Sequence, residues 1–524
     1  MTLTSEMLRT AVTRRLTEFG EQRTIQRLWD RDPSVWGGDA DTPELADRLG
    51  WLSVGRSMVG EVEAVRDFAE KVRREIDRVV LLGMGGSSLA PEVLWRTFGR
   101  QDGYPALQML DSTAPGAVQS VDDGGDLSRT LFIVASKSGT TVETMSFFQY
   151  FWDRTRGNGS QFVAITDPGM SLERLGRERG FKRVFLNPAD IGGRYSALSL
   201  FGLVPAALLG IDAATLLERA EGMANLCAPG TPGIDNPGAA LGVLMAEAAL
   251  AGRDKLTFVM SPGVESFGLW AEQLIAESTG KAGKGIIPVA CEPTSARPRY
   301  CDDRLFVGLS LQGDSSETFN HRLRDLDAAG YPLARIALSD PYDIGAEFFR
   351  WEFATAVSGA VLGVNPFDQP NVAESKKNTM QSLSGADNPA PSSGPRRSRV
   401  VSFLDGVQPG DYVSVQAYMA PSEENDARLA SLCAALHDRV EAAVTVGYGP
   451  RYLHSTGQLH KGGPATGHFI QVMDPVVDDV AIPHAEYSFG QLLAAQAQGD
   501  FEALTARERP IVRVSDPTDL MELM

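Results

Sequence analysis

The chain has 524 residues, a formal net charge of -18 and a pI of about 4.9, which argues against nucleic acid or an anionic membrane as its partner. Hydrophobic residues make up 43% and charged residues 22% of the chain, a composition typical of a globular protein with two or three domains. The amino terminus lacks the apolar core of a signal peptide, and no apolar run is long enough to span a bilayer. We therefore expect a cytoplasmic protein whose 4 cysteines, none of them in a CxxC pair, are free thiols.

Strand and helix patterns divide the chain into five expected regions. Residues 1–60 carry an amphipathic helical pattern, and residues 385–400 form a linker rich in Pro, Ser and Gly. In residues 61–215 and again in 216–384, apolar strand patterns alternate with helical patterns, which indicates βαβ units and a parallel sheet in each region. Residues 401–524 are expected to form a third α/β region. The expected strands are 78–82, 107–111, 131–135, 162–166, 255–260, 305–311, 334–338, 412–418 and 444–446.

A phosphate site is predicted where the third of these strands turns into a helix. Free backbone N–H groups and the positive end of the helix dipole meet at such a turn. Four hydroxyls, an ammonium and a glycine in the turn suit a phosphate monoester, whereas capping the helix needs a single hydroxyl. The residues of this turn are Ser136, Lys137, Ser138, Gly139, Thr140 and Thr141.

A second glycine-rich turn, at residues 83–88, follows the first expected strand. A dinucleotide-binding turn would have a third glycine at the position of Leu89, so the dinucleotide pattern is incomplete. We expect Gly85, Gly86 and Ser87 to bring backbone and a hydroxyl close to a ligand. A merely tight turn explains these glycines equally well when they are taken alone.

Five motifs in this order resemble the glucose-6-phosphate isomerase family, and most closely the isomerase half of bifunctional transaldolase–isomerase proteins. They are residues 83–87, 136–141, 192–196, 273–278 and 365–376. The resemblance covers nearly all of the chain after the first fifty residues. It implies an α/β fold with two SIS (sugar isomerase) domains of α/β sandwich type and a C-terminal α/β extension. The implied activity interconverts glucose 6-phosphate and fructose 6-phosphate by ring opening and a cis-enediol, with a hexose 6-phosphate as the small-molecule partner and no cofactor.

The resemblance also implies roles for single residues. Glu277 matches the family's proton-transferring base, and Arg194 matches the arginine that stabilises the enediolate. A guanidinium suits that role because it stays charged. Lys376 matches a lysine that the family associates with substrate hydroxyls and ring opening. Gln273 precedes Glu277 by one helical turn, so we expect it to reach the same substrate.

The family's ring-opening histidine is missing from its usual place, because residues 286–304 contain no histidine. Residues 453–458 in the C-terminal region look like the same motif displaced along the chain. We therefore predict that His454 supplies the ring-opening function, with His460 as its alternative. Two structural loop histidines explain the segment equally well. No metal is expected, since no carboxylate or cysteine lies at ligand spacing in this segment.

Two other functions remain open at this point. A mannose-6-phosphate or dual-specificity isomerase would use the same enediol, because it serves both epimers at C2. A non-catalytic SIS protein that senses sugar phosphates would keep the phosphate site and lose the base, so the presence of Glu277, Arg194 and Lys376 favours an enzyme. The resemblance implies a homodimer, whereas delivery of His454 within the same chain leaves a monomer open.

Overall fold

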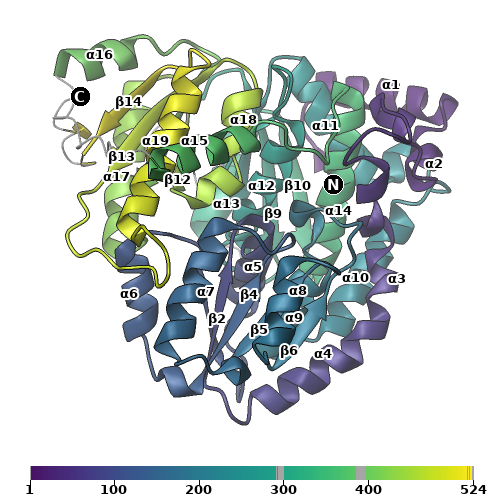
Figure 1. Cartoon of the computed structure of the whole chain (residues 1–524). Coiled ribbons are helices and arrows are strands. Elements are labelled where there is room, and N and C mark those ends of the chain that lie inside the picture. Colours follow the sequence, from purple (N-terminus) through teal and green to yellow (C-terminus); the bar gives the residue numbers. More distant parts are fainter. Residues whose placement is uncertain are drawn as a thin grey trace.

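The computed structural model of the chain describes residues 2–290, 292, 300–314, 316–384, 397–515, 517 and 520–521. Within these residues the strands form three sheets of five, five and four strands. Figure 1 shows how the helices surround these sheets. The expectation of an α/β fold with parallel sheets is confirmed. Of the expected linker, residues 385–396 lie outside the description, and 397–400 begin helix α16 (Arg397–Asp405).

The first sheet has the strand order β3-β2-β4-β5-β6, and all neighbouring strands in it run parallel. Alternate residues of β2 and β4 join two different apolar clusters on opposite faces, which explains why both strands are continuous apolar runs. The edge strand β6 is mostly half-buried, so its sequence lacks the continuous apolar run that marks the other strands, and it is not among the expected strands. The strands are β2 (Arg78–Gly83), β3 (Ala106–Leu110), β4 (Thr130–Ala135), β5 (Phe162–Thr166) and β6 (Arg183–Leu186). The helices that connect them are α5 (Leu89–Phe98), α6 (Pro115–Asp123), α7 (Val142–Arg154) and α8 (Ser171–Glu178).

The second sheet has the order β1-β10-β9-β7-β8. Four of its strands run parallel, and the two-residue strand β1 (Thr2–Leu3) pairs antiparallel with β10 at the sheet edge. The chain therefore does not begin with a helix, because its first residues pair with the free edge of this sheet before helix α1 (Glu6–Glu21) starts. The parallel strands are β7 (Lys255–Met260), β8 (Ile287–Val289), β9 (Arg304–Leu311) and β10 (Leu333–Leu338). The helices of this half are α10 (Ala213–Leu226), α11 (Pro237–Leu250), α12 (Phe267–Thr279), α13 (Glu317–Ala328) and α14 (Asp343–Leu362). Helix α4 (Val59–Val72) lies beside the first sheet, where its Phe68 packs edge-on against Phe185 of β6.

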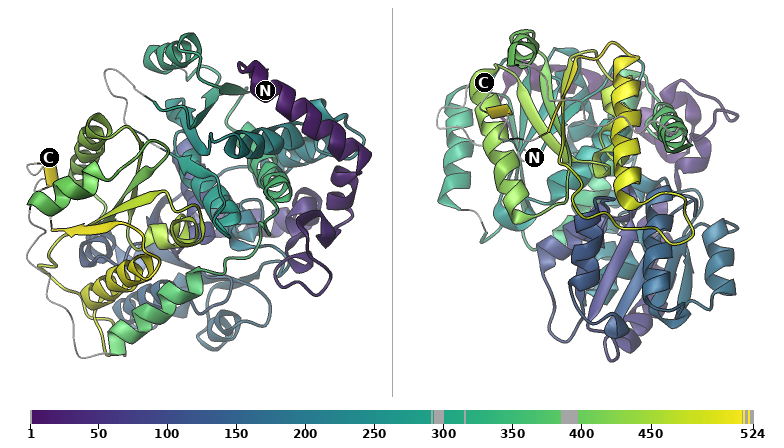
Figure 2. Two further views of the ribbon diagram at one scale, coloured as in Figure 1. Left: turned by 90° about the horizontal axis from the view of Figure 1, so that it is seen from above. Right: turned by 60° about the vertical axis from the view of Figure 1, so that its left-hand side comes forward.

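The third sheet is parallel throughout, with the order β12-β11-β13-β14. It lies at the upper left of Figure 1, and the right-hand view of Figure 2 places its helix α19 directly above the first sheet. Helix α15 (Val372–Ser384), which precedes the linker, packs along α19 and so belongs spatially to this region. The strands are β11 (Tyr412–Tyr418), β12 (Ala443–Tyr448), β13 (Gly467–Met473) and β14 (Ile511–Val514). The helices are α17 (Glu423–Arg439), α18 (Gly457–Gly462) and α19 (Phe489–Thr505).

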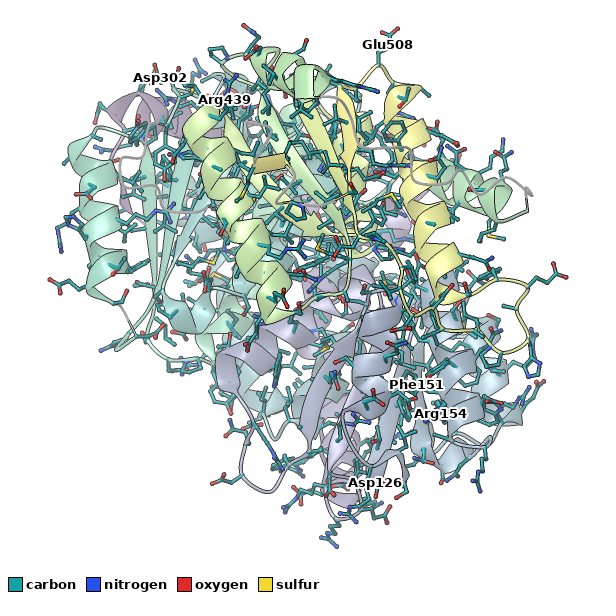
Figure 3. All side chains as sticks on the ribbon, turned by 90° about the vertical axis from the view of Figure 1, so that its left-hand side faces the viewer. Asp126, Phe151, Arg154, Asp302, Arg439 and Glu508 are labelled. Atoms are coloured by element: carbon teal, nitrogen blue, oxygen red, sulfur yellow. The ribbon has the colours of Figure 1, made fainter. Side chains whose placement is uncertain are left out.

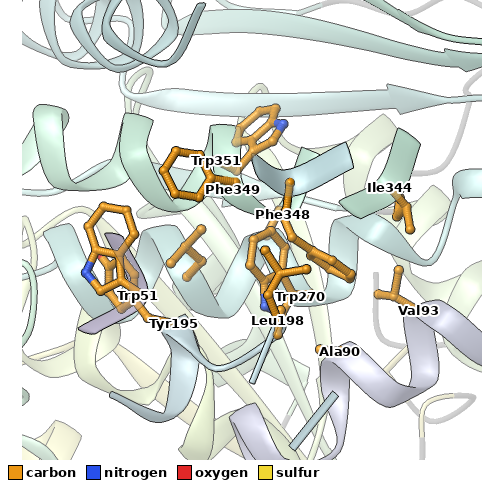
Figure 4. Close-up of a cluster of buried hydrophobic side chains, with 14 of the residues drawn as sticks. Trp51, Ala90, Val93, Tyr195, Leu198, Trp270, Ile344, Phe348, Phe349 and Trp351 are labelled. Carbon is orange, nitrogen blue, oxygen red and sulfur yellow. The ribbon is translucent and has the colours of Figure 1, made fainter. Parts of the chain in front are cut away.

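One continuous apolar core joins the first two sheets through the helices between them. Trp51 packs against Tyr195 with ring centroids 5.2 Å apart, and Trp270 packs edge-on against Phe348 at 4.7 Å, as Figure 4 shows. Figure 3 shows the charged side chain of Glu508 projecting from the periphery of the molecule. No helix in the described ranges has the length and apolarity needed to cross a bilayer.

Candidate active site

The predicted phosphate turn lies between β4 and α7, with its hydroxyls directed to one another and to solvent. The Ser136 Oγ is 3.0 Å from the Thr141 Oγ1 and accepts a 3.1 Å hydrogen bond from the Gly139 N–H. The Ser138 Oγ lies 2.9 Å from the Thr140 Oγ1, and both of these residues are exposed. Thr141 occupies the N-cap position of α7 without making a side-chain capping bond. The Thr141 hydroxyl therefore does not cap the helix. The hydroxyls of the turn lie at a helix N-terminus, which is a favourable position for an anion.

Lys137 departs from the predicted arrangement. Its ammonium donates hydrogen bonds to the Asp167 carboxylate and, at 2.9 Å, to the Ala189 carbonyl oxygen. Those acceptors follow the ends of β5 and β6. In this structure the ammonium therefore pairs with a buried carboxylate just after the neighbouring strand and not with the four hydroxyls, and a contact of Lys137 with a phosphate stays a prediction.

The glycine-rich turn after β2 is a meeting point of three other segments. Gly85 has a φ of +56°, and a Cβ atom there would lie 2.8 Å from both the Gln273 Nε2 and the His454 carbonyl oxygen. A Cβ atom on Gly86 would lie 2.0 Å from the Gly193 carbonyl oxygen. These two glycines are needed because protein backbone and side chains approach them closely. The neighbouring Ser87 is half-buried in the same turn.

Glu277 lies near the end of α12 with two of the predicted site residues beside it. The Gln273 Nε2 donates to the Glu277 Oε2 at 3.1 Å and to the His454 carbonyl oxygen at 2.7 Å. The Arg194 Nη1 lies 3.5 Å from the Glu277 Oε1. The side chain of Arg194 is 3% exposed and that of Glu277 is 13% exposed, so the carboxylate is the more accessible of the two.

Arg194 is fixed by hydrogen bonds to two motifs that are far apart in the sequence. Its Nε donates to the Ser278 Oγ at 2.8 Å, and its Nη1 donates to the Gln369 Oε1 at 2.8 Å. Its Nη2 donates to the carbonyl oxygens of Pro366 and Asp368 at 2.7 and 3.0 Å. With these donors engaged, the guanidinium provides a fixed positive charge next to the Glu277 carboxylate.

Lys281, one turn after Glu277, is a buried member of the same cluster that sequence reasoning missed. Its ammonium donates to the Asp368 Oδ1 at 2.6 Å and also to the Asn365 carbonyl oxygen. Burial, assisted by the charge of Arg194, lowers the pKa of Lys281 to about 7. The available sequence signal is its place three residues after the motif at 273–278, but a lysine there also fits an exposed helix end.

His454 reaches this cluster from the C-terminal region. It ends the short helix η10 (Arg451–His454), and its Nε2 lies 3.0 Å from the Glu143 Oε1. Glu143 also accepts a hydrogen bond from the Gln496 Nε2 at 2.7 Å. Sequence reasoning missed Glu143, since an acidic residue in the first turn of α7 is expected for dipole reasons alone. The histidine thus stands between the phosphate turn and α12.

The third region is anchored next to His454 by Arg451, which forms ion pairs with Glu92 and, at 3.2 Å, with Asp111. The Ser88 Oγ donates to the Asp111 Oδ2 at 3.1 Å, so the anchor is continuous with the glycine-rich turn. Burial raises the pKa of Asp111, and the nearby Arg451 opposes this effect. Charged groups on both sides of the contact therefore fix the position of η10.

The remaining predicted residues do not add to the described cluster. His460 is buried among the rings of Tyr412, Tyr452 and Phe469, and this burial lowers its pKa well below the usual value for histidine. It does not share the surroundings of His454, so its role as an alternative is not supported. Lys376 lies in α15, but its side chain is outside the described residues.

A cavity of about 80 Å³ lies between the phosphate turn and the third region. The predicted residues that line it are Thr140, Thr141 and His454, and Glu143 and Lys461 contribute to it as well. A larger cleft of about 790 Å³ lies between α5, α12 and α17, with Glu272 in its wall. Because the smaller cavity contains two of the turn's hydroxyl residues and the histidine, it is the candidate position for the phosphorylated end of a substrate.

Known proteins that are similar to this chain in sequence include glucose-6-phosphate isomerases. The phosphoglucose isomerase family matches residues 25–284. The glucose-6-phosphate isomerase of Symbiobacterium thermophilum is 30% identical over 398 residues, which cover 64% of this chain and 86% of that protein. The probable glucose-6-phosphate isomerase of Methanococcus maripaludis is 27% identical over 385 residues, or 66% of this chain and 86% of that protein.

Two solved structures share the fold. A hypothetical protein from Thermus thermophilus aligns with a TM-score of 0.62 and 22% identity, covering 72% of this chain and 99% of that one. A glucose-6-phosphate isomerase from Chlamydia trachomatis aligns with a TM-score of 0.58 and 20% identity, covering 76% of this chain and 89% of that one. At these identities the likeness concerns the fold.

Proposed function

The chain belongs to the phosphoglucose isomerase family, and from this premise we propose that it interconverts glucose 6-phosphate and fructose 6-phosphate. The observation that carries the proposal is a chain of contacts: Arg194 and Gln273 flank Glu277, and Gln273 also hydrogen-bonds to the backbone of His454. His454 in turn lines a cavity together with Thr140 and Thr141 of the turn at 136–141. These residues come from four separate segments. An aldose–ketose isomerase needs such a set: a base, a positive charge, an acid–base group for the ring and an anchor for the phosphate.

The phosphate of the substrate is anchored at the N-terminus of α7. The exposed hydroxyls of Ser138 and Thr140, which stand at the positive end of the helix dipole, supply hydrogen-bond donors for its oxygens. The anchor takes no part in the chemistry. Its binding energy positions C1 and C2 of the sugar next to the catalytic groups.

Glu277 transfers the proton between C2 and C1 of the open-chain sugar. The amide of Gln273 holds one carboxylate oxygen, which orients the base, while Arg194 lies next to the other. In the enediolate intermediate, negative charge develops on the oxygens at C1 and C2. The buried positive charge of Arg194 stabilises that charge most strongly when the site excludes water.

His454 opens the sugar ring by moving a proton between the ring oxygen and the C1 hydroxyl. Its hydrogen bond with Glu143 fixes the orientation of the imidazole, which is needed for directed proton transfer. Lys376 is assigned to the substrate hydroxyls on family resemblance.

All of these groups belong to one chain, so we propose that the active site is complete in a monomer. The expectation of a homodimer rests on the family resemblance, and a cytoplasmic location stays a prediction from the sequence. Light scattering of the purified protein, combined with turnover at the same concentration, tests the monomer. Activity that falls on dilution together with dissociation of a dimer would contradict it.

The activity itself is tested by coupled assays on glucose, fructose and mannose 6-phosphates. Glu277→Gln, purified in the same way, controls for isomerase from the expression host. We expect turnover of the glucose and fructose esters, and a loss of about 10³-fold in Glu277→Gln because the proton-transferring base is removed. Binding without turnover of any of the three esters would reject the isomerase in favour of a sugar-phosphate sensor. Faster turnover of the mannose ester would instead favour the dual-specificity alternative.

A further inference from the structure

Lys137 lies in the middle of the phosphate turn but makes its contacts outside it. Its carbonyl oxygen accepts hydrogen bonds from the Thr166 Oγ1 and from the Asp167 N–H, both at 3.2 Å. Its ammonium pairs with the Asp167 carboxylate, whose side chain is 5% exposed, and donates to the Ala189 carbonyl oxygen at 2.9 Å. One residue thus joins the turn to the ends of two neighbouring strands.

Ala189, which accepts one of these hydrogen bonds, precedes Arg194 by five residues in the chain. Residues 187–192 connect β6 to the short helix η7 (Gly193–Tyr195) and belong to neither element. Contacts with other segments therefore fix their position. One such contact is the 2.9 Å hydrogen bond from the Gly50 N–H to the Asp190 carbonyl oxygen. Another is the close approach of Gly193 to Gly86. A shift of Ala189 therefore propagates to Arg194 over only a few residues.

We propose that Lys137 is a positioning residue that couples the phosphate turn to the Arg194 segment, and that it does not bind the substrate phosphate. This inference rests on the proposed isomerase function. An ammonium that left Asp167 for a phosphate would strand a buried carboxylate without its cation, which is costly. The donors for the phosphate are then the hydroxyls and the backbone N–H groups of the turn.

The two roles of Lys137 predict opposite effects of Asp167→Asn. If Lys137 positions the turn, removing the Asp167 charge loosens the turn and the Arg194 segment together. We then expect weaker binding of inorganic phosphate and a kcat about tenfold lower, because a small misplacement of catalytic groups is enough for that loss. If Lys137 binds phosphate, the same variant frees the ammonium, so phosphate binds as tightly as before or more tightly and kcat is kept.

The experiment compares Lys137→Met, Asp167→Asn, the double variant and Lys137→Arg. Calorimetry measures the affinity for inorganic phosphate, and the coupled assay with fructose 6-phosphate measures kcat and KM. Lys182→Met is the matched control, since Lys182 forms an exposed pair with Glu75 in the same sheet region. Thermal melting shows that each variant is folded.

Positioning is supported if both single variants lower kcat and phosphate affinity, and if the double variant is no worse than either, as expected for two members of one contact. Partial rescue of kcat by Lys137→Arg, whose guanidinium can reach both acceptors, supports the same conclusion. Unchanged or tighter phosphate binding with full kcat in Asp167→Asn would overturn the proposal. The calorimetric result stands without turnover, so a failure of the isomerase assay is distinguishable from a failure of this inference.

Discussion

Gly86→Ala is expected to damage catalysis because Gly86 is in close contact with the segment that carries Arg194. The added Cβ would lie 2.0 Å from the Gly193 carbonyl oxygen and 3.0 Å from the Arg194 backbone nitrogen. Both neighbours are backbone atoms, so relief requires the segment to retreat by about 1 Å. A misplacement of about 1 Å in a catalytic group costs about 100-fold in rate. We also expect a loss of about 1–3 kcal/mol in stability from overpacking.

The assay measures kcat/KM for fructose 6-phosphate, with thermal melting to confirm that the variant is folded. Gly222→Ala on α10 is the matched control, because a Cβ atom there meets nothing within 4 Å. We expect Gly222→Ala to behave like the parent protein and Gly86→Ala to lose about 100-fold in kcat/KM. A folded Gly86→Ala protein with unchanged kcat/KM would refute the claim that this contact places Arg194.

Three further substitutions test the surroundings of His454 and the pH dependence of stability. Glu143→Gln replaces the carboxylate that holds both the His454 imidazole and the Gln496 amide, so the imidazole is less well oriented and kcat on the cyclic substrate should fall by about 10²-fold in the coupled assay. An unchanged kcat would contradict this. Arg451→Met leaves Asp111 without its ion-pair partner and Glu92 with Arg96 alone, and it should cost about 3 kcal/mol in urea unfolding. An unchanged midpoint would show that Arg451 does not anchor the third region. Burial raises the pKa of Glu272 from 4.5 in the unfolded chain to about 8 in the folded protein. Between these two pH values the folded protein holds a proton that the unfolded chain has lost. The free energy of unfolding therefore falls as pH rises through this range. Glu272→Gln should remove up to about 1.4 kcal/mol per pH unit of this decline, and unfolding curves of identical pH dependence in both proteins would contradict it.

Most of the long buried strands could be predicted from the sequence, but the buried central strand β13 and the short edge strands β1, β6, β8 and β14 are not among the expected strands. The structure places β4 at Thr130–Ala135 against an expected 131–135, because apolar residues on both faces give a continuous signal. Strand β14 (Ile511–Val514) alternates between half-buried and buried residues over a very short length. Strand β1 has two residues and exists only through its pairing with β10. Such strands are defined by their tertiary partners, which local patterns do not contain.

Family motifs mark residues that the structure brings close together, whereas the roles of these residues stay predictions. The structure brings Glu277, Gln273 and His454 together although His454 lies far along the chain. The hydrogen bond of Glu143 and the orientation of the Lys137 side chain could not be predicted. Glu143 depends on His454 and Lys137 depends on Asp167, and each of these partners lies in another segment. Residue type and spacing give a position on an element, whereas the orientation of a long charged side chain follows from the charges packed around it.

The central claim is that His454, supplied by the C-terminal region of the same chain, opens the ring for a reaction that Glu277 completes. The direct measurement is turnover by His454→Ala on two substrates. One is cyclic fructose 6-phosphate, and the other is a tetrose 4-phosphate, whose phosphorylated terminal oxygen cannot close a ring. We predict a loss of at least about 10²-fold on the cyclic substrate, with proton exchange on the open-chain substrate retained. Equal turnover of both substrates by His454→Ala and the parent protein would contradict the claim.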